Sequence, residues 1–334
     1  MNPPKVNRRR STLLFGLALL LVGQASAADA ERVARVGWLT LSSSGRYEEV
    51  TARGFVAGLR EAGFVEGKNL LLVKRSANGD LRQLRPLAKE IVAANVDVIF
   101  APAKPMADAA WYASRKIPTV IATVTNPVTV EYAVSLARPG KHITGVTTAS
   151  AELIGKRMQL LTELVPGIKR LGIFIDPDLL ASCTEEMDLM ESSARTLGLS
   201  LVRIKIAAGK EVDLADAVQR AVAARVQAVM TAPMTGHQDI TDRLAEQAAK
   251  VGMPFVHDVP QLAGDALAVY GPDFEDIYRR AGLYAARILK GETPAEMAIE
   301  EPREFKLIVN QKVATRLGLR LPQSVLVRAD EVIR

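Results

Sequence analysis

The stretch VDVIFAP at residues 96–102 returns later in the chain, in closely similar form, as VQAVMTAP at residues 226–233. The segments on either side return in the same order, with residues 35–40 (RVGWLT) matching 170–175 (RLGIFI) and residues 117–120 (IPTV) matching 253–256 (MPFV). A repeat that occurs once, with helices between short apolar strands, predicts two similar α/β lobes rather than a solenoid. Two such lobes facing each other make a cleft, and we expect function to lie there.

Strands and amphipathic helices alternate along the chain, which demands parallel pairing and right-handed crossovers. We therefore predict an α/β fold of two similar Rossmann-like lobes with parallel sheets around a hinged cleft. The chain is expected to cross between the lobes three times, first near residues 138–142, and to return to the first lobe at residues 262–270. The predicted division is residues 1–27 as a signal peptide, 28–147 with 261–303 as the first lobe, and 148–260 with 304–334 as the second.

The first 27 residues read as an export signal, because Lys5 and the arginines at 8–10 precede a short apolar run at 13–22 and a small-residue cleavage site at 25–27. The run is shorter than the ~20 residues that span a bilayer, which disfavours the alternative of an uncleaved anchor. The arginines also resemble a twin-arginine signal, but adjacent arginines are common in basic leader segments, so the ordinary secretory route is favoured.

Cleavage after residue 27 would remove four basic and no acidic residues, so the formal net charge falls from +6 to +2 and the case for a nucleic-acid partner is lost. Cys183 is the only cysteine, so no disulfide forms within one chain, and no cysteine follows the signal to carry a lipid anchor. These facts predict a soluble periplasmic protein.

Ligands of open parallel sheets bind beyond the carboxyl ends of the strands, where helices begin and backbone N–H groups are free. At these ends we select the candidate ligand-binding residues Ser43, Ser44, Pro102, Ala103, Lys104, Thr125, Asn126, Asp176, Pro233, Asp258 and Tyr270. Several have an ordinary alternative role. The two serines would equally serve as caps of the next helix, Asp176 as a turn residue before Pro177, and Lys104 as a solvated lysine.

Enzyme signatures are missing from the sequence. No Gly-x-Ser-x-Gly elbow occurs, and the histidines at 142, 237 and 257 lack metal-ligand spacing. Residues 63–69 resemble a phosphate loop but run from helix to strand, the reverse of the required order. Glu185, Glu186 and Asp188 are expected to form a solvated acidic start to a helix. We therefore predict no catalysis, no metal and no cofactor.

Several motifs resemble the substrate-binding proteins of ABC transporters, in the family that includes tryptophan- and tyrosine-binding members. They are residues 117–122, 126–128, 135–140 (SLARPG), 143–147, 156–157, 163–167, 270–273, 317–319 and 322–333. The resemblance covers essentially the whole mature chain. It implies a type I periplasmic-binding fold, with a hinged cleft and no catalysis.

Two departures from the family pattern concern the ligand. Thr125-Asn126-Pro127 stands where relatives often read Gly-Asp-Pro, which removes a carboxylate from the pocket rim, and His142 stands near a common Gly-Asn. A ligand ammonium would lose a partner, so an aromatic or other carboxylic acid is as compatible as an amino acid. The resemblance implies delivery of a small molecule to a membrane permease. The alternatives are a sensor subunit that docks on a receptor kinase and an exported α/β enzyme, which the missing catalytic motifs disfavour.

Overall fold

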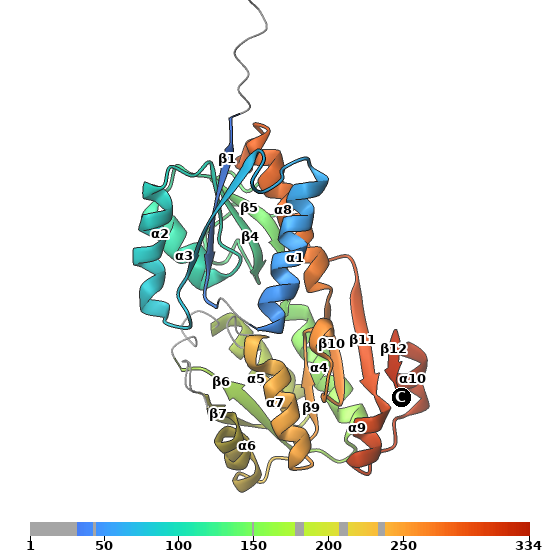
Figure 1. Cartoon of the computed structure of the whole chain (residues 1–334). Coiled ribbons are helices and arrows are strands. Elements are labelled where there is room, and N and C mark those ends of the chain that lie inside the picture. Colours follow the sequence, from blue (N-terminus) through green and yellow to red (C-terminus); the bar gives the residue numbers. More distant parts are fainter. Residues whose placement is uncertain (1–31, 43–44, 149, 178–183, 207–212, 233–237) are drawn as a thin grey trace, which may run out of the picture. The chain divides into compact units, whose positions relative to one another are not determined.

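The computed structural model describes residues 32–334, except residues 43–44, 149, 178–183, 207–212 and 233–237. The strands form two sheets (Figure 1). The first sheet is parallel and has five strands in the order β2-β1-β3-β4-β5. These strands are β1 (Ala34–Thr40), β2 (Leu70–Ser76), β3 (Val98–Phe100), β4 (Thr119–Val124) and β5 (Ile143–Thr147).

The second sheet has seven strands in the order β12-β11-β10-β9-β8-β6-β7, parallel except for the β10–β11 pair. They are β6 (Arg170–Ile175), β7 (Ser200–Lys205), β8 (Ala228–Thr231), β9 (Phe255–His257), β10 (Ala268–Pro272), β11 (Phe305–Asn310) and β12 (Glu331–Ile333). From β7 to β10 this order repeats the first sheet, because β7, β6, β8, β9 and β10 take the places of β2, β1, β3, β4 and β5. The predicted fold of two similar Rossmann-like units is confirmed.

Helices cover both faces of the first sheet. Its helices are α1 (Arg46–Glu61), α2 (Leu84–Ala93), α3 (Lys104–Ala113) and α8 (Phe274–Leu289). α1 and α8 lie side by side on one face although they are far apart in sequence, and α2 and α3 cover the other (Figure 1). The core beneath α1 and α8 contains Trp38, Phe55 and Phe100, of which the two phenylalanine rings are stacked at 3.8 Å.

Glycines allow α1 and α8 to approach closely. A Cβ atom on Gly58 of α1 would lie 1.9 Å from the carbonyl oxygen of Arg279, and one on Gly282 of α8 would lie 2.2 Å from the carbonyl oxygen of Phe55. Only glycine permits this backbone-to-backbone contact.

The second sheet is also covered on both faces. α4 (Ser150–Leu164), α5 (Thr184–Thr196), α9 (Gln311–Arg316) and α10 (Gln323–Arg328) pack on one face, and α6 (Leu214–Ala223) and α7 (Gln238–Lys250) pack on the other. Within the described residues, no helix is long and apolar enough to cross a membrane.

The chain passes between the two sheets three times, the expected number: between β5 and α4, between β10 and α8, and between Glu300 and β11. The expected start of the first crossing near residues 138–142 is wrong, because β5 (Ile143–Thr147) follows this segment and pairs with β4 in the first sheet. The expected return to the first lobe at residues 262–270 is wrong for β10. This strand pairs with β9 and β11 in the second sheet, so the chain returns only after Pro272. Val259 and Leu262, just before β10, do pack in the first core, so the segment contacts one unit and then rejoins the other. The exact lobe boundaries stay a prediction.

Candidate functional site

The end of β3 leads through Pro102 and Ala103, both buried, into the first turn of α3. The carbonyl oxygen of Pro102 accepts hydrogen bonds from the backbone N–H groups of Ala122 (2.9 Å) and Thr123 (2.7 Å). This residue therefore fixes the spacing of the β3 and β4 ends. Ala103 is the N-cap of α3 and makes no side-chain cap.

Lys104 is partly buried at the start of α3. Its ammonium lies 2.8 Å from a carboxylate oxygen of Asp108, one turn along the same helix. The hydroxyl of Tyr132 donates to the other oxygen of that carboxylate, and burial raises the pKa of Tyr132 well above its usual range. Lys104 is thus held in place by an internal ion pair rather than left as a mobile surface lysine.

Thr125 and Asn126 follow β4 and meet the first turn of α5, which belongs to the second sheet. Nδ2 of Asn126 donates to Oε1 of Glu185 at 3.3 Å, while Oδ1 of Asn126 accepts two backbone N–H groups of the following turn at 3.2 Å each. The hydroxyl of Thr125 hydrogen-bonds the carboxylate of Glu186. Polar groups from the two sheets therefore meet at this point. We call Lys104, Thr125, Asn126, Glu185 and Glu186 the strand-end cluster.

The burial of Glu186 contradicts the expectation that the acidic residues at the start of α5 are solvated. Glu186 is only 9% exposed, whereas Asp188 is exposed as expected. Burial raises the pKa of the Glu186 carboxyl, and the nearby charge of Glu185 acts in the same direction. The hydroxyl of Thr125, the residue's own N–H and the charge of Lys104 oppose this rise. The physical reason is that α5 turns the side chain of Glu186 toward the ends of β3 and β4 rather than toward water.

A second group forms around Arg157 of α4, which brings together the predicted site residues Asp258 and Tyr270. Arg157 is 2% exposed, and its Nη1 donates to the carbonyl oxygen of Tyr270 at 3.3 Å. Burial lowers the pKa of Arg157, while the charge of Asp258 and the nearby Tyr270 oppose that shift. The neighbouring His257 is neutral at physiological pH, because burial and the charge of Arg157 lower its pKa to about 3.

Asp176 lies directly after β6 and is 2% exposed, so it is a buried residue at the strand end rather than part of an exposed turn. Ser43, Ser44 and Pro233 fall outside the described residues, and Gly45 is the N-cap of α1. Among the described residues, no group of three or more His, Cys, Asp or Glu side chains is arranged to hold a metal ion.

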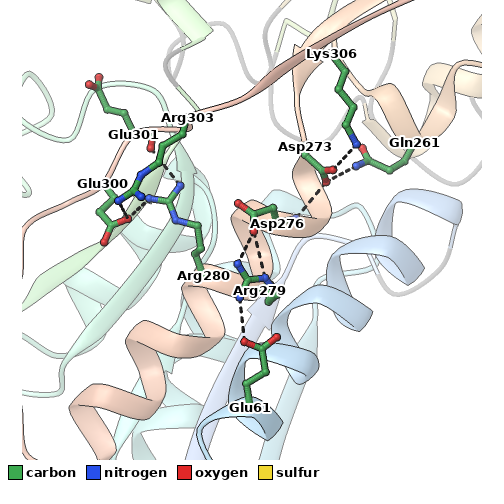
Figure 2. Close-up of polar contacts among 10 residues, drawn as sticks. All are labelled: Glu61, Gln261, Asp273, Asp276, Arg279, Arg280, Glu300, Glu301, Arg303 and Lys306. Carbon is green, nitrogen blue, oxygen red and sulfur yellow. Dashed lines mark hydrogen bonds and ion pairs between the residues drawn. The ribbon is translucent and has the colours of Figure 1, made fainter. Parts of the chain in front are cut away.

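A cavity of about 560 Å³ lies elsewhere, between α8 and residues 300–304. Figure 2 shows several of its charged side chains, which pair with one another or with neighbouring residues outside the cavity. Asp276 accepts from Arg279 at 2.7 Å, and Glu300 forms an ion pair with Arg280. None of the residues predicted for the ligand site lines this cavity.

Arg157 and Glu186 were missed as site residues, but the sequence carries a signal for both. Arg157 falls on the apolar face of α4, with Ile154 and Leu161 three and four residues away, and Glu186 precedes Met190 on the apolar face of α5. A charged residue within an apolar helix stripe indicates a buried charge, and buried charges occur at functional sites more often than exposed ones.

The model of the family described as ABC transporter substrate binding protein matches residues 39–333. A tyrosine-binding protein of Clostridioides difficile (strain R20291) is 24% identical over 281 residues, which cover 80% of this chain and 76% of that protein.

Three solved structures share the fold. A conserved domain protein from Vibrio cholerae has a TM-score of 0.79 at 26% identity, covering 90% of this chain and 100% of that one. An ABC domain from Streptococcus pneumonia in complex with L-Trp has a TM-score of 0.78 at 22% identity, covering 90% and 99%. A solute-binding protein from R. palustris in complex with benzoate has a TM-score of 0.54 at 16% identity, covering 77% and 79%. These are type I periplasmic binding folds.

Proposed function

This chain belongs to the family of ABC transporter substrate-binding proteins, and we propose that it captures a small organic ligand between its two lobes and delivers it to a permease at the inner membrane. The proposed ligand is an amino acid or an aromatic or other carboxylate compound. Relatives named for tyrosine, L-Trp and benzoate support this range. The proposed lobes are those predicted from the sequence, with β10 moved to the second.

The observation that carries this proposal is the contact between Asn126, beyond β4 of the first sheet, and Glu185 in α5 of the second. A ligand held between two lobes needs polar groups from both at the carboxyl ends of their strands. The strand-end cluster supplies an ammonium, a hydroxyl, an amide and two carboxylates in this position. We propose that the lobes open and close about the chain crossings, so that X-ray scattering would record a smaller radius of gyration when ligand is added.

Export is part of the proposal, because the permease faces the periplasm. Residues 1–27 would be removed there, so N-terminal sequencing of protein from periplasmic extracts should begin at Ala28. A retained Met1, or protein confined to the cytoplasm, would contradict export.

A thermal-shift screen of amino acids, aromatic acids, purines and short peptides tests ligand capture. A ligand at about 100 times its dissociation constant adds roughly 2.7 kcal/mol of stability. Asn126→Leu should abolish this shift and leave the unliganded melting temperature almost unchanged, because a strand-end loop contributes little to the core.

Gln159→Leu is the matched control. Gln159 lies on the exposed face of α4, and its side-chain amide donates to Glu163 of the same helix at 3.5 Å. This variant also places a leucine where a side-chain amide stood, and it should keep full ligand binding. Normal binding by Asn126→Leu would show that the ligand site lies elsewhere.

A further inference from the structure

Two carboxylates of α5 lie beside the residues that follow β4. In the structure, Glu185 lies 3.3 Å from the Asn126 amide, and Glu186 is hydrogen-bonded by the neighbouring Thr125. α5 therefore places negative charge at the end of β4, where it would favour a ligand that carries a positive charge.

Glu186 is buried without a cation of its own. Among the described residues, no lysine or arginine forms an ion pair with it, and the nearest positive charge, that of Lys104, is already bound to Asp108 at 2.8 Å. A carboxylate removed from water is costly unless a positive charge and hydrogen bonds compensate it. Thr125 supplies a hydrogen bond, but the positive charge is missing.

We propose that Glu186 is the specificity-determining residue of the ligand site and that it pairs with an ammonium or similar cationic group on the ligand. This inference rests on the proposed function. A ligand cation would supply the positive charge that none of the described residues pairs with Glu186, and its charge-assisted hydrogen bond would be strong because Glu186 is buried. The proposal narrows the ligand class from amino acids or carboxylates to compounds that carry an amino group.

The test uses paired probes on the mature protein. Each common L-amino acid is measured beside the carboxylic acid that lacks its amino group, for example L-tyrosine beside 3-(4-hydroxyphenyl)propionate, and benzoate is added as an acid without an amine. We expect the tightest probe to carry an ammonium and its deaminated partner to bind at least about tenfold more weakly. A tightest probe without an amino group would overturn the role of Glu186 and leave ligand capture intact. Failure of every probe to bind would contradict ligand capture itself.

Glu186→Gln removes the charge and keeps the shape and the hydrogen bond with Thr125. It should lower the affinity for ammonium-bearing probes by about 10- to 100-fold and leave the affinity for the deaminated probes unchanged or higher. The control is Glu191→Gln on the same helix, where the carboxylate pairs with Arg203 near the surface and is 39% exposed. That variant should bind every probe as the wild type does. Equal weakening of both probe classes by Glu186→Gln would mean that Glu186 only shapes the site.

Discussion

The strand-end cluster and the charged side chains along α8 are built in different ways. Along α8, Asp273 meets Lys306 at 2.8 Å, Asp276 meets Arg279 at 2.7 Å, and Glu300 meets Arg280 (Figure 2). In the strand-end cluster, the more buried carboxylate, Glu186, has no such cation within the part of the chain that the structure describes. Carboxylates that pair within the chain hold its segments together, whereas a buried carboxylate left without a cation is suited to a ligand.

The three ion pairs along α8, which we call the α8 pairs, lie where a structural role is expected. The backbone of Glu300 is tied to β5, since its N–H donates to Gly145 (3.0 Å) and its carbonyl accepts from Thr147 (2.8 Å). Asp273 accepts from Gln261 at 2.7 Å and also caps the start of α8. These pairs therefore fix the segments by which the chain leaves and re-enters the second sheet. Their lysine and arginine partners hold the pKa of Asp273 and of Glu300 below the usual value against the opposing effect of burial.

The largest effect is expected where α8 is held against α1. Gly58→Ala would place a methyl group 1.9 Å from the Arg279 carbonyl, so the two helix backbones must separate and stability should fall by roughly 3 kcal/mol. Ligand affinity of the folded fraction should not change. Denaturant unfolding measures the loss of stability, and calorimetric titration measures the ligand affinity.

Gly155→Ala, in α4, is the control for this substitution. Its new methyl group would lie 3.3 Å from the hydroxyl oxygen and 3.9 Å from Cβ of Ser193, whose side chain can rotate away, and alanine favours a helix over glycine. This variant should therefore be as stable as the wild type or more so. A loss of ligand affinity in Gly58→Ala would link the two regions that we treat as separate.

The next test removes one carboxylate from each region. Glu300→Gln takes away the partner of Arg280, whose side chain is 11% exposed, and should cost about 1–2 kcal/mol of stability, allowing for the partial exposure of Glu300. Glu186→Gln should leave the unliganded protein equally stable or more stable, because it removes a buried charge that nothing described here neutralises. Denaturant unfolding of both variants without ligand measures the two changes in the free energy of unfolding. A larger loss of stability for Glu186→Gln than for Glu300→Gln would mean that Glu186, and not Glu300, has the structural role.

The pH dependence of binding follows from the raised pKa of Glu186. Because the raised pKa keeps a proton on this carboxyl to a higher pH than on an ordinary glutamate, lowering the pH through that pKa removes the charge that pairs with a ligand ammonium. Affinity for an amino acid probe should therefore fall with decreasing pH, by at most about tenfold per pH unit.

Calorimetric titration over a series of pH values measures this fall, and Glu186→Gln should abolish it. Burial raises the pKa of Glu186, and the neighbouring Thr125, Glu185 and Lys104, which also act on it, are unchanged in that variant. His257 stays neutral above a pKa of about 3 and does not contribute. An equal pH dependence in Glu186→Gln would assign the titration to another group.

The internal repeat predicted the fold well, because strand order follows from local pattern. The same repeat also indicates that residues 268–272, which form β10, belong to the second sheet. Residues 268–272 occupy the place of β5, and each of these strands carries a glycine against a neighbouring carbonyl: a Cβ on Gly145 would lie 2.1 Å from the Ile121 oxygen, and one on Gly271 would lie 1.8 Å from the Asp258 oxygen.

The site was harder to predict than the fold. Lys104, Thr125 and Asn126 lie just beyond strand ends of the first sheet, as predicted, since topology fixes where parallel strands end. Their role in ligand binding stays a prediction. Glu186 was not selected, because its place beside Thr125 depends on how α5, from the other sheet, lies against the end of β4. The apolar stripe of α5 indicates that Glu186 is buried, but the partner beside which it is buried depends on packing between distant elements, which a local pattern does not report.

The smallest effect is expected for Arg303→Ala, which asks whether the α8 charges act as pairs or as one network. The Arg303 side chain is 84% exposed and its guanidinium lies 3.9 Å from Glu300, whereas Arg280 holds the same carboxylate and also donates to the Glu301 carbonyl at 3.1 Å (Figure 2). An exposed, long ion pair contributes little, so stability should change by no more than about 0.5 kcal/mol. Denaturant unfolding at low and high salt measures this. A loss as large as that of Glu300→Gln would mean that Arg303 holds Glu300 as firmly as Arg280 does, and the α8 carboxylates would then act as a cooperative network rather than as separate pairs.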